Sequence, residues 1–176
     1  AGERIQQALA LQPKNAALHR SWGRYLVVRK EPKKAEEAFH KAIQLAPKDS
    51  SALVDLGNVY LGGLKRPDQA AKTFSSAVKL DPNNANAHFG LGASYAVLKK
   101  TTEAFSELET VVRLTPNNLA AYMAMGNLYQ EQKDYDKARL AYDAALKIEP
   151  RFADAAMAKG DLLALQGRFG EAKQSY

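Results

Sequence analysis

The chain has 176 residues, of which 46% are hydrophobic and 25% are charged, and it contains no cysteine. This composition is that of a folded globular protein, and the lack of cysteine excludes disulfides, thiolate metal sites and a cysteine nucleophile. No apolar run approaches the roughly 18 residues that a membrane span needs. Of the net charge of +6, +5 lies in residues 1–50, which we interpret mainly as a solvated, lysine-rich helix face.

Prolines recur along the chain at nearly constant intervals of 34, 35, 34 and 34 residues. They are Pro13, Pro47, Pro82, Pro116 and Pro150. A glycine follows each of them after ten residues, and an alanine precedes each by twelve. The interval from Gly57 to Ala70 is 13 residues, whereas the equivalent intervals are 12. One extra residue therefore lies in this segment, near Gly62 and Gly63.

Each interval predicts two α-helices. In the first helix, apolar residues recur at spacings of three and four, as at Leu53, Leu56 and Tyr60. A short polar side chain stands before the first helix of each full repeat, where an N-cap oxygen would accept a free backbone N–H. These residues are Asn15, Asp49, Asn84 and Asn118. The second helix runs from near the alanine, as in residues 35–45, and the following proline ends it.

Small residues stand where the two helices of a pair must approach each other. Glycines lie in the first helix and alanines in the second, and helices joined by a short turn pack closely only where bulk is absent. Large residues fill the intervals, among them Phe39, Phe74 and Tyr142. We interpret these aromatic positions as core packing, because no cofactor is needed to explain them.

A 34-residue unit with glycine at place 8, alanine at places 20 and 27, an aromatic residue at place 24 and proline at place 32 resembles the tetratricopeptide repeat. The last full repeat shows the pattern as Gly126, Ala138, Tyr142, Ala145 and Pro150. The third repeat departs from it, with Leu108 and Val111 in place of the aromatic residue and the alanine. The resemblance covers the whole chain. It implies an all-α fold, a right-handed superhelical solenoid of antiparallel helix pairs.

On this frame residues 1–176 form a single array. Residues 1–15 match a second helix only, residues 16–49, 50–84, 85–118 and 119–152 match full repeats, and residues 153–176 match part of a repeat. Natural arrays end in polar capping helices, and neither end of this sequence resembles one. We therefore expect the chain to be a fragment of a longer protein, and its uncapped ends are candidates for self-association.

The sequence offers little sign of catalysis. Its histidines, His19, His40 and His88, form no metal-ligating motif, and the carboxylates are scattered over exposed helix positions. We accordingly predict no catalytic residue, no cofactor and no metal site, and we expect the chain not to be an enzyme.

The resemblance also implies a site. In tetratricopeptide proteins the first helices line a concave groove, which side chains at places 2, 5, 9, 12 and 13 face. The candidate peptide-binding residues carried over from those places are Arg20, Arg24, Val54, Asn58, Leu61, Phe89, Val97, Met123, Asn127, Gln130 and Met157.

This set is apolar in the middle, with two asparagines that can bond a partner's backbone. Arg20 and Arg24 make one end basic, and acidic residues follow at the far end. An apolar strip rimmed by polar groups is typical of a partner site. We therefore expect a scaffold that binds a peptide or partner helix with an apolar face, its acidic end toward the first repeat.

Two other interpretations remain open. The chain can be the recognition arm of a larger enzyme or cell-envelope assembly machine whose chemistry lies elsewhere. Helical repeats of about this length also bind RNA, one base for each repeat. Against nucleic acid, no pair of base-reading polar residues recurs from repeat to repeat.

Overall fold

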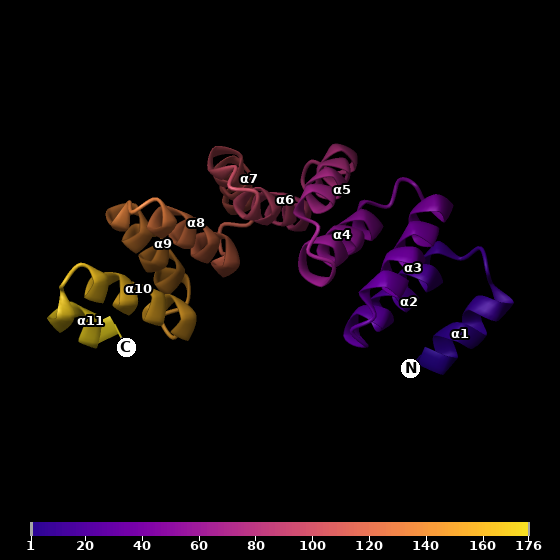
Figure 1. Cartoon of the computed structure of the whole chain (residues 1–176), viewed down its shortest axis with the longest axis horizontal. Coiled ribbons are helices and arrows are strands. Elements are labelled where there is room, and N and C mark those ends of the chain that lie inside the picture. Colours follow the sequence, from indigo (N-terminus) through magenta and orange to yellow (C-terminus); the bar gives the residue numbers. More distant parts are fainter. Residues whose placement is uncertain (1, 176) are drawn as a thin grey trace. The chain divides into compact units, whose positions relative to one another are not determined.

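The computed structural model describes residues 2–175, and the chain divides into an N-terminal unit, residues 1–100, and a C-terminal unit, residues 101–176. The N-terminal unit holds α1 (Gly2–Leu11), α2 (Ala16–Val28), α3 (Pro32–Leu45), α4 (Ser50–Asn58), the π-helix η1 (Val59–Gly63), α5 (Pro67–Leu80) and α6 (Ala85–Val97). The C-terminal unit holds α7 (Thr101–Leu114), α8 (Leu119–Glu131), α9 (Tyr135–Ile148), α10 (Ala153–Leu165) and α11 (Phe169–Ser175) (Figure 1). The described residues contain no strand, so the predicted all-α fold is confirmed. Ala1, the first of the alanine column, lies outside them.

The polar side chains before the first helices are N-caps, as predicted. The side-chain oxygens of Asn15, Asp49, Asn84 and Asn118 accept backbone N–H groups of the first helical turn at 2.9–3.2 Å. At the other end of the helix pair, in each full repeat, the second helix stops two residues before a proline, as α3, α5 and α9 show. This follows because the residue before proline avoids helical backbone angles.

In three of the four full repeats the two helices of a pair meet where a glycine lies against an aromatic ring. A Cβ added to Gly23 would lie 2.7 Å from the ring of Phe39, and one on Gly57 would lie 2.7 Å from Phe74. In the C-terminal unit a Cβ on Gly126 would lie closer still to the ring of Tyr142. Each of these rings is at most 1% exposed. The rings therefore occupy the space that any side chain at the glycine would need.

The ring of Phe74 also reaches the next helix pair. A Cβ on Gly90, in α6, would overlap this ring, which therefore stands between Gly57 of its own repeat and Gly90 of the following one. Together with Leu56 and Leu91 it belongs to the hydrophobic core of the N-terminal unit. Gly90 thus has a packing role that was not predicted from the sequence.

The extra residue of the second repeat is absorbed inside a helix. After α4 the backbone widens into η1, where the N–H of Leu64 bonds the carbonyl of Val59 at 2.8 Å, five residues back. The N–H of Arg66 then bonds the carbonyl of Tyr60 at 2.8 Å. A single π-turn accommodates one inserted residue without breaking the helix. The following helix α5 keeps its place in the repeat for this reason.

Every first helix from α2 to α10 is followed by a left-handed residue. Lysine takes this position four times, with φ between 56° and 61°, and Gly167 takes it once. These lysines are Lys30, Lys65, Lys99 and Lys133. At the first of them, the N–H of Lys30 bonds Val27 and the N–H of Glu31 bonds Leu26, which is the Schellman arrangement. This column was not predicted from the sequence, because lysine gives no sign of a positive φ.

The glycine–ring contact predicts that one added methyl group at the glycine strongly lowers the stability of the fold. We expect Gly126→Ala to lower the free energy of unfolding by about 1–3 kcal/mol, because Tyr142 must move to admit the new Cβ. Urea denaturation followed by circular dichroism measures this. Gly170→Ala is the matched control, since nothing lies within 4 Å of its Cβ position. Equal stability of the two variants would contradict this packing.

At the left-handed lysines, a substitution by glycine should stabilise the fold. We expect Lys133→Gly to raise the free energy of unfolding by about 1 kcal/mol, because a side chain at positive φ is strained. Lys147→Gly, inside α9, should instead destabilise by about 1 kcal/mol through loss of helix propensity. Thermal and urea unfolding of both variants provide the measurement, and destabilisation by Lys133→Gly would show that the lysine stem contributes more than its backbone strain costs.

Candidate functional site

Five of the predicted groove residues line one hollow of the N-terminal unit. Its volume is about 280 Å³, and it is bounded by the first helices of three successive repeats, α2, α4 and α6. The predicted residues in its wall are Arg20, Arg24, Val54, Asn58 and Phe89. Their neighbours there, Ser51, Asp55, Asn84 and Asn86, are polar. The structure thus brings together side chains that lie up to 69 residues apart in the sequence.

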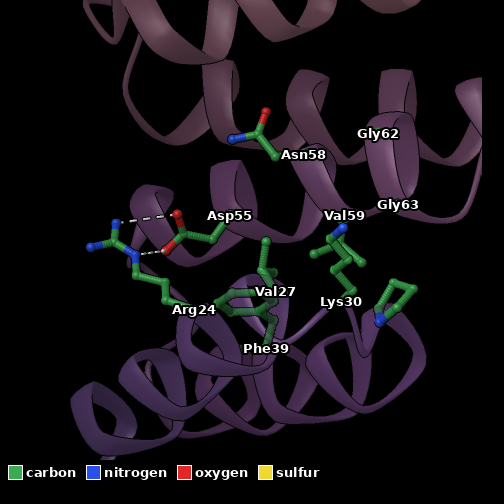
Figure 2. A pocket seen from close by; sticks show the side chains of 10 residues that line it. Arg24, Val27, Lys30, Phe39, Asp55, Asn58, Val59, Gly62 and Gly63 are labelled. Carbon is green, nitrogen blue, oxygen red and sulfur yellow. Dashed lines mark hydrogen bonds and ion pairs between the residues drawn. The ribbon is translucent and has the colours of Figure 1, made fainter. Parts of the chain in front are cut away.

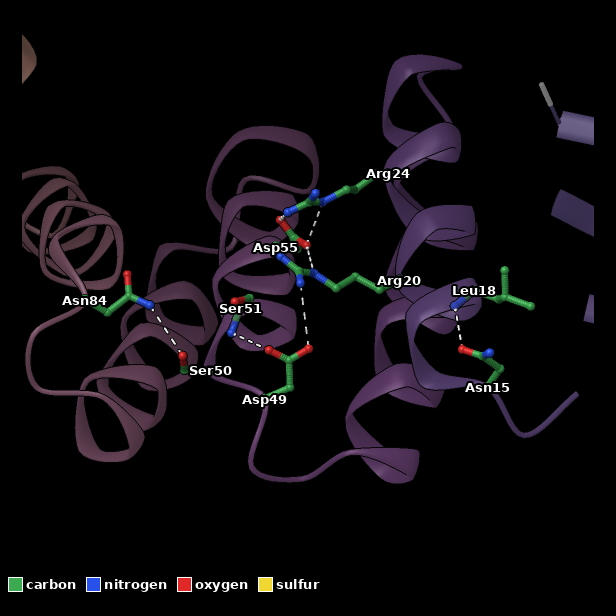
Figure 3. A network of polar contacts seen from close by, with 9 residues as sticks. All are labelled: Asn15, Leu18, Arg20, Arg24, Asp49, Ser50, Ser51, Asp55 and Asn84. Atoms are coloured by element: carbon green, nitrogen blue, oxygen red, sulfur yellow. Dashed lines mark hydrogen bonds and ion pairs between the residues drawn. The ribbon is translucent and has the colours of Figure 1, made fainter. Parts of the chain in front are cut away.

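Asp55 is the centre of a polar network in this wall (Figure 3). Its Oδ2 accepts hydrogen bonds from Nε of Arg20 at 2.6 Å and Nε of Arg24 at 2.9 Å. Arg20 also lies 3.7 Å from the carboxylate of Asp49, the N-cap of α4. The Asp55 side chain is only 15% exposed, so its charge requires these partners. The network fastens α2 to α4 across two repeats.

This network corrects the electrostatics expected from the sequence, in which Arg20 and Arg24 form a basic end of the groove. In the structure Asp49 and Asp55 balance both charges, and Asp55 accepts hydrogen bonds from Nε of both arginines and from Nη2 of Arg24. A preference for an acidic partner therefore cannot rest on these two arginines.

The apolar candidates of the N-terminal unit differ in exposure. Val54 and Leu61 are half-buried and pack against the core of the unit. Phe89 is half-buried in the wall of the hollow, whereas Val97, at the end of α6, is 58% exposed. Phe89 is thus the large apolar group that the hollow presents.

The candidates of the C-terminal unit lie on α8 and α10. Met123 packs against the core of that unit, and Met157 is 51% exposed. The hydroxyl of Tyr142 donates toward the side-chain oxygens of Asn127 at 2.8 Å and Gln130 at 3.0 Å. Burial raises the pKa of that hydroxyl above its ordinary value of 10.0, so it remains a donor at neutral pH. The side-chain oxygens of Asn127 and Gln130 are therefore engaged by Tyr142, whereas their side-chain N–H groups remain for a ligand.

Asn58 occupies the same place in the second repeat as Asn127 does in the fourth. The aromatic residue behind it is Phe74, which has no hydroxyl. Asn58 is exposed, and its amide bonds no other group within the described residues. A phenylalanine in the second helix therefore leaves this amide available.

A second hollow of the N-terminal unit was not predicted from the sequence. It has a volume of about 550 Å³ and lies beside η1. Arg24, Asp55 and Asn58 belong to both hollows. The one signal in the sequence was the extra residue near Gly62 and Gly63, and its structural effect was not foreseen.

The histidines have structural partners. Nε2 of His19 lies 2.8 Å from the carbonyl oxygen of Pro13, and Nε2 of His88 lies 3.0 Å from that of Pro82. Both join a first helix to the turn before it. Residues 2–175 contain no cluster of His, Asp or Glu side chains suited to a metal ion. None of the described helices has the length and apolar character needed to cross a membrane.

Comparisons with known proteins agree with this architecture. A family model described as tetratricopeptide repeat matches residues 1–50, 54–118 and 123–176. No curated protein sequence matches the chain. Among solved structures, MamA is 25% identical with a TM-score of 0.77, and the alignment covers 87% of this chain and 89% of that one.

Two further structures are similar in fold at lower identity. YrrB, described as a TPR protein with an unusual peptide-binding site, is 22% identical with a TM-score of 0.75, over 99% of this chain and 90% of its own. PilW, described as a type IV pilus biogenesis factor, is 19% identical with a TM-score of 0.90, over 97% of this chain and 79% of its own.

The polar network predicts that Asp55 stabilises the N-terminal unit. We expect Asp55→Asn to lower the free energy of unfolding by about 2 kcal/mol, because Arg20 and Arg24 lose their shared counter-charge. Asp154→Asn, at an exposed position of α10, is the matched control and should change stability by at most about 0.5 kcal/mol. Urea unfolding measures both, and an unchanged midpoint for Asp55→Asn would mean that the network contributes little.

Proposed function

Because this chain belongs to the tetratricopeptide-repeat family, we propose that it is a non-catalytic scaffold that binds a peptide or a helix of a partner protein. The binding surface that we propose is the groove formed by the first helices of the N-terminal unit, α2, α4 and α6. The observation that carries this proposal is the convergence of Arg20, Arg24, Val54, Asn58 and Phe89 on one hollow. Proteins of this fold generally act through such surfaces.

The chemistry of the hollow suits an extended or helical segment. Phe89 and Val54 supply apolar area, while Asn58 and Asn86 supply amide groups for a partner's backbone. The ion pairs of Asp55 hold α2 and α4 in place before a ligand arrives, which reduces the ordering cost of binding.

The C-terminal unit offers a similar but softer surface. Met157 is half exposed, and methionine side chains adapt to apolar groups of varied shape. Met123, Asn127 and Gln130 are on α8, and each has a contact inside the unit that steadies its position. We infer that this unit contributes adaptable contacts, whereas the N-terminal unit contributes the fixed hollow.

The charge of the N-terminal unit favours an acidic partner segment. Residues 1–100 contain 16 Lys and Arg residues and 8 Asp and Glu residues, a net charge of +8, whereas the whole chain carries +6. The attraction therefore comes from the unit as a whole and accelerates encounter more than it sets affinity. The unusual peptide-binding site described for YrrB lends support by analogy of fold.

A random peptide library displayed on phage tests the proposal even though the partner is unidentified. We expect selection on the immobilised chain to yield peptides whose affinity, measured by fluorescence polarisation, falls about tenfold or more in Phe89→Glu. Phe169→Glu is the matched control, because Phe169 is 70% exposed on α11 and lies outside the groove set. Circular dichroism should show equal helicity for the three proteins.

Two outcomes would contradict the proposal. One is a library selection that enriches no sequence above background. The other is a set of enriched peptides that bind the Phe89→Glu and Phe169→Glu variants equally well. Loss of helicity in Phe89→Glu would instead place Phe89 in the core.

A further inference from the structure

The larger hollow beside η1 lies where the second repeat has a glycine and the other repeats have a larger side chain. Gly62 stands at place 13 of its repeat. The equivalent residues are Val28, Val97, Glu131 and Leu165. A Cβ on Gly62 would meet nothing within 4 Å, whereas one on Gly63 would lie 2.9 Å from the Cβ of Pro32. Both glycines stand in the lining of this hollow, whose volume is about 550 Å³.

Four of the ten residues that line this hollow have apolar side chains, and two of these four are buried. Phe39 and Val59 are 1% and 3% exposed, and Val27 and Pro32 complete the apolar lining. Figure 2 shows Val27 and Phe39 entering from one side, with Gly62 and Gly63 at one end of the hollow and the Arg24–Asp55 pair at the other. A preformed apolar cavity of this size is typical of a site that receives a bulky group, and π-turns occur frequently at functional sites.

The polar groups of the rim point to the charge of the occupant. Lys30 lines the hollow, and its ammonium group has no ion-pair partner among the described residues. Asp55, the only carboxylate in the lining that the structure describes, is already neutralised by Arg20 and Arg24. Asn58 adds a free amide. The rim therefore favours a negative or hydrogen-bond-accepting group next to the apolar one.

We propose that this hollow is the anchor pocket for the partner segment, and that it takes one leucine or aromatic side chain that lies next to an aspartate or glutamate. The apolar side chain fills the space left by Gly62, and the neighbouring carboxylate pairs with Lys30. The inference rests on the proposed function, because Arg24, Asp55 and Asn58 are shared with the groove. It adds a sequence preference to that function.

Indole-3-acetate and its neutral analogue indole-3-acetamide probe the pocket directly, by NMR titration of the full chain. We expect the amide signals of Val59, Gly62 and Gly63 to shift, and the carboxylate to bind about two- to fivefold more tightly than the amide. Lys30→Gln should remove that difference. Lys133→Gln is the matched control, because Lys133 has the same backbone conformation at the equivalent place. Equal binding of the two probes to the unaltered chain would overturn the role of Lys30.

Gly62→Leu tests whether a partner uses the pocket. We expect it to abolish probe shifts and to weaken library-selected peptides about tenfold, and selection on this variant should no longer enrich a leucine or aromatic residue beside an acidic one. Gly170→Leu, also in open space, should change neither result.

The two proposals fail differently. Peptides that depend on Phe89 but bind Gly62→Leu normally would overturn the anchor pocket and leave the groove intact. Probe binding with no peptide enriched would overturn the proposed function, and would show a site for free small molecules in place of a partner anchor.

Discussion

The close approach of a glycine in the first helix to an aromatic ring in the second is the constraint on which this structure depends. The rings of Phe39, Phe74 and Tyr142 fill the space over Gly23, Gly57 and Gly126, and they are almost wholly buried. Because Phe74 also lies against Gly90, one ring fixes both the pairing of two helices and the stacking of one pair on the next. The first helices are thereby held side by side in the N-terminal unit, which creates the hollow between them.

Much of this was predictable, because it depends on local chemistry that repeats. Asn15, Asp49, Asn84 and Asn118 marked the helix starts, and the glycine and alanine columns marked the close contacts. The left-handed lysines were not predictable, since only Gly167 among the five equivalent residues has a type that favours positive φ. At Lys30, Lys99 and Lys133 the two Schellman hydrogen bonds form even though a side chain stands at positive φ.

Five of the eleven candidate groove residues share one hollow, but their binding role stays a prediction, and their contacts with one another were not predicted. The repeat frame correctly placed Arg20, Arg24, Val54, Asn58 and Phe89 on one wall, because places in a repeat map directly onto faces of a helix. The same frame could not show that Asp55 faces Arg20 and Arg24, because that contact depends on how two successive repeats are stacked. The interval from Gly57 to Ala70 likewise showed that one residue is inserted near Gly62. It could not show how the chain absorbs this residue, because a longer loop and a π-turn would do so equally well.

The identity of the aromatic residue in the second helix decides which polar groups of the first helix are already hydrogen-bonded. Where it is tyrosine, as at Tyr142, its hydroxyl engages the oxygens of Asn127 and Gln130. Where it is phenylalanine, as at Phe74, Asn58 keeps both its oxygen and its N–H groups. A buried position that the family defines only as aromatic thus controls the polarity of the surface above it. Repeats with the same helices and the same asparagine therefore differ in the hydrogen-bonding groups that they leave unpaired.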